Sequence, residues 1–186
     1  MQTEINNCLN VLRKGGLILY PTDTVWGIGC DATNYEAVEK IFQLKQRAET
    51  KSMICLVSDL KMLNLYIQDI PKAAYDILKY AIKPTTIIYD KPIRVTENLI
   101  VNNNTLAIRI VKDGFCNELI RKFKKPIVST SANISGKPTP KSFKEISQEI
   151  IKGVDYVVNL PNEKKAVKPS SIIKLSNDGK VIVIRE

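Results

Sequence analysis

Apolar residues recur at helical spacing in several segments of the chain, and most of these segments begin at a residue that can cap a helix. Thr3, Asn34 and Asp59 precede three such segments. The side-chain oxygens of these residue types accept hydrogen bonds from the first free N–H groups of a helix. Further helices are predicted from Pro71 to about Ile82, from Phe115 to Phe123, and from a capping box at Ser142–Glu145 to about Lys152.

Short apolar runs rich in β-branched residues lie between these helices and predict strands. They cover residues 17–20, 52–58, 85–90, 105–110, 126–129, 155–160, 170–175 and 180–185. Interleaved helices and strands favour a layered α/β or α+β domain on one sheet. The last two strands are joined at Asn177–Gly179 and predict an antiparallel hairpin, so the sheet is expected to mix parallel and antiparallel pairs.

The length and composition fit one soluble domain. The chain has 186 residues, of which 44% are hydrophobic and 25% charged. No repeat or linker divides it, so we expect a single domain over residues 1–186 with no additional C-terminal domain. No stretch is apolar for long enough to span a membrane, and the first residues do not resemble a signal peptide, which predicts a cytoplasmic protein.

Histidine is absent from the chain. Histidine-based triads, acid–base pairs and metal sites are therefore excluded. Four cysteines lie far apart with no CxxC pair, so free thiols packed as small hydrophobic groups are expected instead of a zinc site, and no resident metal is predicted.

The formal net charge is +9. An unspecific surface excess and a site for an anionic partner, such as a nucleotide, a polyphosphate or RNA, explain this charge equally well.

The segment YPTDTVWGIGCDA (20–32) follows the first predicted strand. Thr22, Asp23 and Thr24 are turn formers, and taken alone the segment is most simply a strand, a turn and a second strand. It matches neither a phosphate-binding P-loop nor the dinucleotide fingerprint, because the residues that define those motifs are missing.

Lys45 and Arg47 lie at the predicted end of the second helix. The simplest interpretation is a solvated basic helix end without a role in the core. Residues two apart on a helix point about 200° away from each other, so these side chains can share a site only if the helix ends near Lys45.

The predicted strand TLAIRI (105–110) alternates between two sets of side chains. Thr105, Ala107 and Arg109 are expected on one face. Two interpretations remain open for Arg109: a solvent-facing side chain on a half-exposed strand, or a ligand for a carboxylate or phosphate in a polar groove.

Uncharged polar residues follow another predicted strand in KPIVSTSANISGKPTP (125–140). Ser129 and Ser131 share a face if the strand continues, and Asn133 lies just beyond them. Hydroxyl and amide groups hydrogen-bond a ligand without repelling an anion, so this row is a candidate binding edge.

Together these segments resemble, in order and over nearly the whole chain, the YrdC-like (TsaC-type) threonylcarbamoyl-AMP synthases. The matching segments are GGLILYPTDTVWGIGCDA, IFQLKQRAETKSMICLV, TLAIRI, KPIVSTSANISGKPTP and SSIIKL. The family signature, Lys-x-Arg followed much later by Ser-x-Asn, corresponds to Lys45, Arg47, Ser131 and Asn133. The resemblance implies a YrdC-like fold, in which helices pack around a twisted mixed sheet with a basic concave groove.

The resemblance also implies a reaction. L-threonine, bicarbonate (or CO2) and ATP, carried with Mg2+, give threonylcarbamoyl-AMP and pyrophosphate. Partner proteins then transfer the threonylcarbamoyl group to an adenosine (position 37) of tRNAs that read codons beginning with A.

Roles for individual residues follow from the same resemblance. Threonine is expected to contact Thr24, Arg109, Ser129 and Ser170, with its carboxylate on Arg109. ATP is expected to contact Arg47, Lys51, Thr105, Ser131, Thr139 and Arg185. Lys45 and Asn133 complete the signature, and the catalytic set is expected to be Lys45, Arg47, Ser131 and Asn133.

The chain departs from the family pattern in a few places. Trp26 replaces a Tyr or Phe. The segment with Lys83-Pro84 replaces the family's common Trp-Pro-Gly-Pro before a strand, and the segment with Lys168-Pro169 replaces its usual Glu/Pro-Ser-Thr-Ile. A related group, the YciO-like proteins, has a similar Lys-Pro segment but lacks the Lys-x-Arg and Ser-x-Asn signature.

The rival hypothesis is a non-catalytic module that binds tRNA or double-stranded RNA. Such a module uses dispersed basic residues and aromatic stacking, and only 6% of this chain is aromatic. Weak tRNA binding is nevertheless expected from the net charge.

Overall fold

A nine-stranded sheet runs through the structure, in the order β7-β1-β2-β6-β3-β5-β4-β8-β9. The computed structural model describes residues 1–47, 53–101, 104–112, 114–160 and 169–186. The pairs β1–β7, β3–β5 and β4–β8 are parallel, and the remaining pairs are antiparallel. The predicted mixed α+β fold is therefore confirmed.

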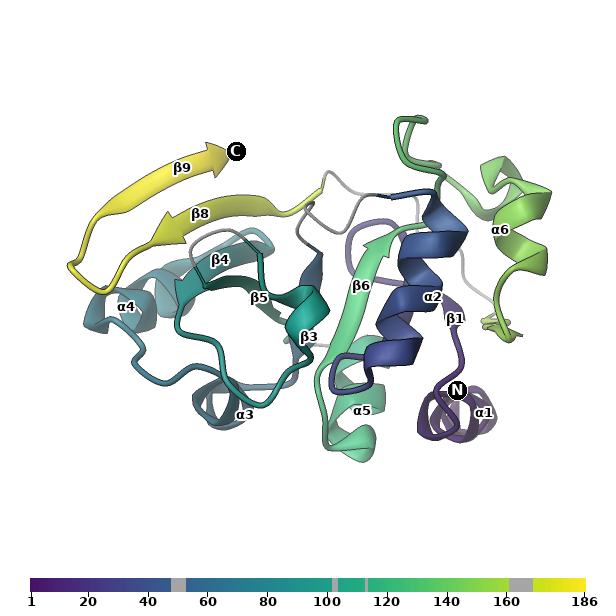
Figure 1. Ribbon diagram of the computed structural model, residues 1–186, viewed down its shortest axis with the longest axis horizontal. Coiled ribbons are helices and arrows are strands. Elements are labelled where there is room, and N and C mark those ends of the chain that lie inside the picture. The colour runs from purple at the N-terminus through teal and green to yellow at the C-terminus, as the bar shows by residue number, and fades with distance from the viewer. Residues whose placement is uncertain (48–52, 102–103, 113, 161–168) are drawn as a thin grey trace.

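The strands span β1 Ile18–Pro21, β2 Trp26–Asp31, β3 Ile54–Val57, β4 Thr85–Asp90, β5 Thr105–Ile110, β6 Ile127–Ser131, β7 Tyr156–Val157, β8 Ser171–Leu175 and β9 Val181–Arg185. The helices span α1 Gln2–Arg13, α2 Tyr35–Lys45, α3 Leu60–Tyr66, α4 Lys72–Tyr80, α5 Gly114–Phe123 and α6 Gln148–Lys152, with short 3-10 helices η1 Glu97–Leu99 and η2 Phe143–Glu145. In Figure 1, α2 crosses in front of the sheet, while α1 and α5 lie together below it.

The predicted caps hold for two helices. Asn34 Oδ1 accepts a hydrogen bond from the Ala37 N–H at 2.9 Å, and Asp59 Oδ1 accepts one from the Met62 N–H at 2.7 Å. The cap predicted at Thr3 is wrong, because α1 already begins at Gln2 and Thr3 lies inside it. Both confirmed caps therefore come from residues that directly precede a helix.

The capping box predicted at Ser142–Glu145 is also wrong. The Glu145 side chain accepts a hydrogen bond from the Lys141 N–H, one residue before the expected partner. The chain makes only the short helix η2 there. A new start follows at Ser147, whose Oγ accepts a bond from the Ile150 N–H and caps α6. The expected single helix is therefore divided in two.

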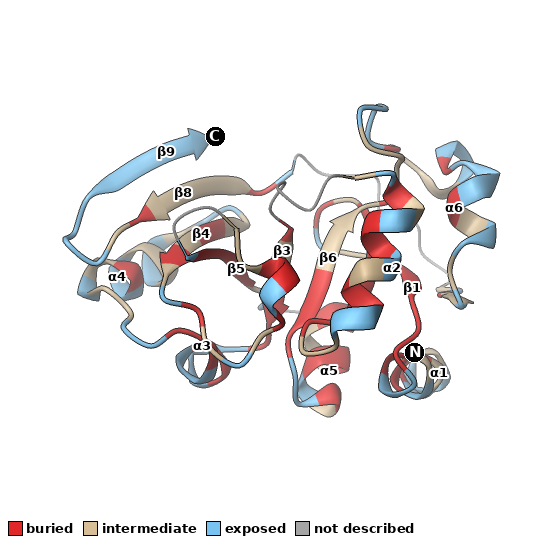
Figure 2. Cartoon of the chain, viewed as in Figure 1, coloured by how far each residue is buried: buried red, intermediate tan, exposed pale blue. Residues whose placement is uncertain are grey.

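The core lies in the middle of the sheet. Figure 2 shows buried residues along β3, β5 and the first half of β6, whereas β9 at the sheet edge is exposed along its length. The hairpin of β8 and β9 is antiparallel, as predicted. In the parts of the chain that the structure describes, no helix is both long and apolar enough to cross a membrane.

We predict that Asn34→Ala lowers the free energy of unfolding by about 1 kcal/mol, because the first turn of α2 loses its cap. Thr3→Ala is the matched control, since Thr3 is exposed and caps nothing. Denaturant unfolding measures both variants. Equal losses for the two substitutions would contradict the assigned cap.

Candidate functional site

The turn between β1 and β2 is organised by one hydroxyl group. Thr22 Oγ1 donates to the Val25 carbonyl oxygen at 2.6 Å and accepts from the N–H groups of Thr24 and Val25. The Thr24 hydroxyl oxygen lies 3.0 Å from Thr22 Oγ1, and Thr24 is buried. This network fixes the backbone of the turn that carries Asp23.

Asp23 forms an ion pair with Arg109 on β5. Arg109 Nη2 lies 2.9 Å from Asp23 Oδ1, with the Arg109 side chain 4% exposed and the Asp23 side chain 31% exposed. The interpretation of Arg109 as a solvent-facing residue is therefore wrong. Strand β5 lies between β3 and β4, and both of its alternating sets of side chains are buried from Thr105 to Arg109. A buried guanidinium needs such a partner, because desolvation of a lone charge costs several kcal/mol.

Thr86, Ser170 and Arg185 lie beside this ion pair. Thr86 on β4 is directly opposite Arg109, and its hydroxyl lies 2.8 Å from that of Ser170, with both residues buried. Arg185 donates from Nε and Nη2 to the Ser170 carbonyl oxygen, at 3.0 and 2.8 Å. Burial, and secondarily the charge of Arg109, lower the pKa of Arg185.

The end of α2 has the geometry that Lys45 and Arg47 need to share a site. Helix α2 ends at Lys45, and Gln46 adopts a left-handed conformation with φ 50°. The Gln46 N–H bonds to the Gln43 carbonyl and the Arg47 N–H to the Phe42 carbonyl, which is a Schellman motif. The backbone therefore turns away from the helix axis between Lys45 and Arg47, so the condition for a shared site is met.

Lys45 joins α2 to the loop that follows β6. Its ammonium donates to the carbonyl oxygen of Ser131 at 2.5 Å and to that of Asn133. Its own carbonyl oxygen accepts from the Ser135 N–H at 2.8 Å. Lys45 is only 1% exposed, so the expected solvated helix end without a core role is wrong. Burial, and then the charge of Arg47, lower the pKa of Lys45 to about 8.

The hydroxyl row lies along β6 and continues into the next loop. Ser129 pairs with Gly29 and Ile54, and Ser131 pairs with Gly27. A Cβ on Gly27 would lie 3.1 Å from Ser129 Oγ, so the glycine leaves room for this hydroxyl.

Asn133 is held in the loop after β6. Its Nδ2 donates to the carbonyl oxygens of Lys137 at 2.6 Å and Ile134 at 3.1 Å. Its Oδ1 is buried and accepts no hydrogen bond from the part of the chain that the structure describes. An amide held by its nitrogen leaves this oxygen as an acceptor for a donor that the described protein does not supply.

Three further candidates are less closely placed. Thr105 is buried at the opposite end of β5 from Arg109, about 13 Å away at the usual rise per residue. Thr139 is exposed in the loop after β6. Lys51 lies outside the described residues. The structure thus groups the candidates around Arg109 and around Lys45.

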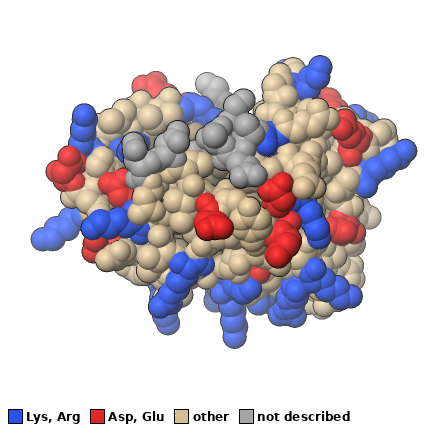
Figure 3. Space-filling view, viewed as in Figure 1, with Lys and Arg blue, Asp and Glu red and all other residues tan. Residues whose placement is uncertain are grey.

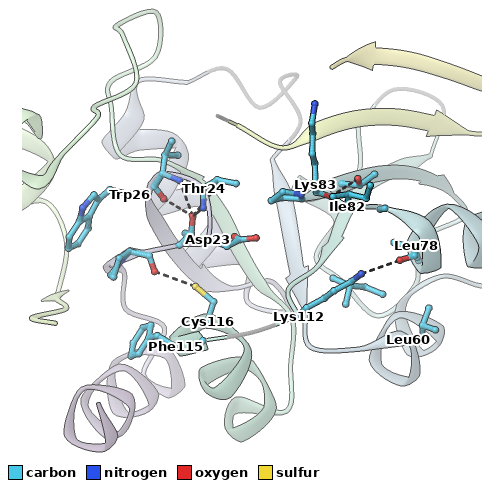
Figure 4. A pocket seen from close by; sticks show the side chains of 18 of the residues that line it. Asp23, Thr24, Trp26, Leu60, Leu78, Ile82, Lys83, Lys112, Phe115 and Cys116 are labelled. Carbon is cyan, nitrogen blue, oxygen red and sulfur yellow. Dashed lines mark hydrogen bonds between the residues drawn. The ribbon is translucent and has the colours of Figure 1, made fainter. Parts of the chain in front are cut away.

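A cleft of about 990 Å³ opens beside the β1–β2 turn. Figure 4 shows Asp23, Thr24 and Trp26 on one side of the cleft and Leu78, Ile82 and Lys83 on the other. Most of its lining is apolar. Figure 3 shows Lys and Arg gathered along the lower edge and at the two ends of one face, with carboxylates near its centre. The basic concave groove therefore stays a prediction.

The four cysteines are free and buried, as predicted. Burial is the main cause that raises the pKa of Cys8, Cys55 and Cys116 to about 12, so these thiols stay protonated near neutral pH. Among the described residues, no group of three or more carboxylate or cysteine side chains could hold a metal ion.

Sequence reasoning missed two residues near Arg109. The sequence pattern indicates Asp23 only as a turn former, although it lies in one of the segments that carry the family resemblance. Thr86 carried no signal beyond its place in a strand. Both become evident only when the strand register brings β4 and the β1–β2 turn to Arg109.

We predict that Lys45→Met lowers the free energy of unfolding by about 2–4 kcal/mol, because the two carbonyl oxygens lose their donor. Lys40→Met is the matched control on the same helix: Lys40 is exposed and donates to one carbonyl oxygen, that of Gly15. Thermal and denaturant unfolding compare the two. If both variants are as stable as the wild type, Lys45 has no structural role.

The lowered pKa of Lys45 also predicts a pH dependence. The native pKa of about 8 lies below the ordinary 10.5, so between these values the unfolded chain binds a proton that the native protein does not. Stability therefore rises with pH in this window, and the contribution is constant below it. The stability of the wild type relative to Lys45→Met should increase from about pH 8 to about pH 10. A flat or falling difference would argue against a buried, weakly basic amine.

Comparison with known families identifies residues 10–186 with the Sua5/YciO/YrdC model, which is described as telomere recombination. A threonylcarbamoyl-AMP synthase of Pseudoalteromonas translucida is 34% identical over 184 residues, which cover 97% of each chain. One of Idiomarina loihiensis is 32% identical over 168 residues, which cover 89% of this chain and 90% of the relative.

Solved structures agree with this assignment. P. abyssi Sua5 complexed with L-threonine is 27% identical with a TM-score of 0.85, and the match covers 94% of this chain and 52% of that one. The chain therefore spans about half the length of that Sua5. E. coli YciO is 26% identical with a TM-score of 0.86, and the match covers 100% of this chain and 90% of YciO. The chain belongs to the Sua5/YciO/YrdC family.

Proposed function

We propose that the chain joins L-threonine, CO2 or bicarbonate, and ATP into threonylcarbamoyl-AMP with release of pyrophosphate. Relatives of 32–34% identity over most of the chain carry the name of this enzyme, and the chain is an enzyme of this type. The observation that supports the proposal best is the contact of Lys45 with Ser131 and Asn133. It brings the two halves of the family signature together from positions far apart in the sequence.

The threonine site in this proposal lies around Arg109. The guanidinium receives the substrate carboxylate, because charge-assisted bonds from arginine to carboxylate are strong and directional. Thr24, Ser129 and Ser170 supply hydroxyl groups around it. A site whose buried polar groups match a substrate hydroxyl rejects analogues that lack it, which favours threonine over an apolar amino acid of similar size.

The ATP site in this proposal uses basic groups that follow α2 and that lie on β9. Arg47 and Arg185 contact phosphates, Ser131 and Thr105 contribute hydroxyl groups, and Thr139 and Lys51 complete the set. Burial lowers the pKa of Arg47, yet arginine stays charged at neutral pH. Mg2+ comes with the ATP phosphates, which are its usual ligands.

Chemistry at this site depends on holding anions together. The threonine amine, after it has lost its extra proton to solvent, adds to CO2 and releases a second proton to form a carbamate. A carbamate oxygen then attacks the α-phosphorus of ATP, and the bond to pyrophosphate breaks. The cationic groups offset repulsion between the reactants, and their fixed positions supply the proximity that the reaction needs. Lys45 and Asn133 shape the phosphate and carbamate region, and the free Asn133 Oδ1 offers an acceptor there.

The product then passes to proteins that transfer the threonylcarbamoyl group to tRNA. In this proposal the chain itself does not read RNA, although its net charge of +9 favours weak tRNA binding that declines with salt. Cytoplasmic tRNA is the final acceptor. A YciO-like activity is less favoured, because the chain retains the complete Lys-x-Arg and Ser-x-Asn signature.

The proposal is tested by incubating the pure protein with ATP, L-threonine, bicarbonate and Mg2+, with and without tRNA. Mass spectrometry should detect threonylcarbamoyl-AMP at equal rates in both reactions. A salt series of tRNA binding belongs to the same experiment. Product that forms only with tRNA, or salt-resistant binding of one tRNA without any product, would favour the RNA-binding module.

We predict that Arg109→Lys raises the KM for threonine about 10- to 100-fold, because lysine keeps the charge beside Asp23 but loses the planar fork. The KM for ATP should change little. Alanine is a poorer test, because it leaves the Asp23 carboxylate without its buried partner. Steady-state kinetics with each substrate varied in turn measure both constants. Equal increases for the two substrates would move Arg109 out of the threonine site.

A further inference from the structure

The ion pair between Asp23 and Arg109 leaves part of each ion available. Arg109 Nη2 donates to Asp23 Oδ1 at 2.9 Å, whereas Arg109 Nε is buried and has no hydrogen-bond partner among the described residues. Asp23 is the more exposed residue of the pair, and it lines the cleft beside the β1–β2 turn, as Figure 4 shows. Within the described part of the chain, Arg109 thus has an unused N–H group, at Nε, and lies next to a carboxylate that is reached from the cleft.

An α-amino acid carries the complementary pair of charges. Its carboxylate and ammonium groups are attached to the same carbon atom, so they lie about as close together as the members of a hydrogen-bonded ion pair. We propose that L-threonine inserts into the Asp23–Arg109 pair, with its carboxylate on Arg109 and its ammonium group on Asp23. This inference rests on the proposed function, and it adds Asp23 to the threonine site as the residue that recognises the amine.

Charge balance explains why Asp23 selects an amino acid. When a zwitterion inserts, each protein ion exchanges one opposite charge for another, so neither is left alone in a partly buried site. A carboxylic acid without the ammonium group that takes the place of Asp23 on Arg109 leaves the Asp23 carboxylate without a cation. A charge that loses its partner in such a site is costly, so the hydroxy acid binds more weakly.

The other ionisable groups around the pair do not take over this role. Burial is the main cause that raises the pKa of Tyr20 and of Cys116, so both stay neutral near pH 7. Arg185 bonds to the Ser170 carbonyl oxygen beside Thr86, but it is a cation and repels an ammonium group. Asp23 is thus the anion at this point of the described site.

Two ligands test the proposal: L-threonine and its analogue 2,3-dihydroxybutanoate of the same configuration, in which a hydroxyl group replaces the ammonium group. Isothermal titration calorimetry without ATP measures the Kd of each for the wild type and for Asp23→Asn. The wild type should prefer threonine by about tenfold or more. In Asp23→Asn, threonine should bind about 10- to 100-fold more weakly and the analogue no more weakly than before, so that the preference disappears.

The ratio of the two Kd values distinguishes recognition of the amine by Asp23 from a purely structural role in which Asp23 holds Arg109 in place. If Asp23 only holds Arg109 in place, both ligands weaken together and the preference persists, which overturns the proposal. Asp69→Asn, which removes a carboxylate from a surface ion pair with Lys91, is the control and should leave both Kd values unchanged. If Asp23→Asn does not fold, Asp23→Glu gives the second test. This variant retains the carboxylate and should retain a preference for threonine over the analogue. Loss of that preference in folded Asp23→Glu, with unchanged binding of the analogue, would count against the proposal.

Measurements on the wild-type protein distinguish failure of the role proposed for Asp23 from failure of the proposed enzyme function. If the wild type makes threonylcarbamoyl-AMP but Asp23→Asn still prefers threonine, the role of Asp23 is wrong and the function stands. If the wild type neither binds threonine nor makes the product, the proposed function fails and this inference fails with it.

Discussion

The contact between the Lys45 ammonium and the carbonyl oxygens of Ser131 and Asn133 is the interaction on which the arrangement of the site depends. It joins the end of α2 to the loop after β6, and the Lys45 carbonyl adds a third bond to the Ser135 N–H. The left-handed Gln46 makes this possible, because it stops the helix where Lys45 still reaches the loop. Lys45 is only 1% exposed, and removing its ammonium group from water costs free energy. The hydrogen bonds to the two carbonyl oxygens offset that cost.

A second buried cation organises the other half of the site. Arg109 lies in the interior strand β5, and Asp23 reaches it from the β1–β2 turn. The sheet therefore brings together segments from near the start of the chain, from its middle and, through Ser170 and Arg185, from its end. Replacing one member of such a buried pair leaves the other without compensation, so the two positions depend on each other. This explains how a chain without histidine can assemble a polar site from arginine, lysine, aspartate and hydroxyl groups.

The sequence predicted much of the fold, because local signals and the final structure agree in most segments. Asn34 and Asp59 start helices where their side chains can cap them, and most strands occupy their expected positions. The strand predicted over 155–160 is an exception, because it is limited to Tyr156–Val157. The Ser142–Glu145 signal failed because Glu145 bonds to the neighbouring Lys141 N–H, and a competing cap at Ser147 begins a separate helix. Both partners in that competition are local, and the sequence alone does not rank them.

The composition of the candidate site was easier to predict than its burial. The family resemblance names Lys45 and Arg109, yet the pattern around each residue is equally typical of a solvated position. Their burial depends on partners far away in the chain: Ser131 and Asn133 for Lys45, and Asp23 for Arg109. Such partners become visible only with the strand register, which is also why Asp23 and Thr86 were overlooked as site residues. Lys51 lies outside the described residues, and its role stays a prediction.

The most direct test of this account is a crystal structure of the protein with L-threonine and a non-hydrolysable ATP analogue. The account predicts the threonine carboxylate on Arg109, its ammonium group within hydrogen-bonding distance of Asp23, and the triphosphate between Arg47 and Arg185 with the Lys45 contacts intact. Threonine bound away from Arg109, or a nucleotide that requires Lys45 to release the loop after β6, would contradict it.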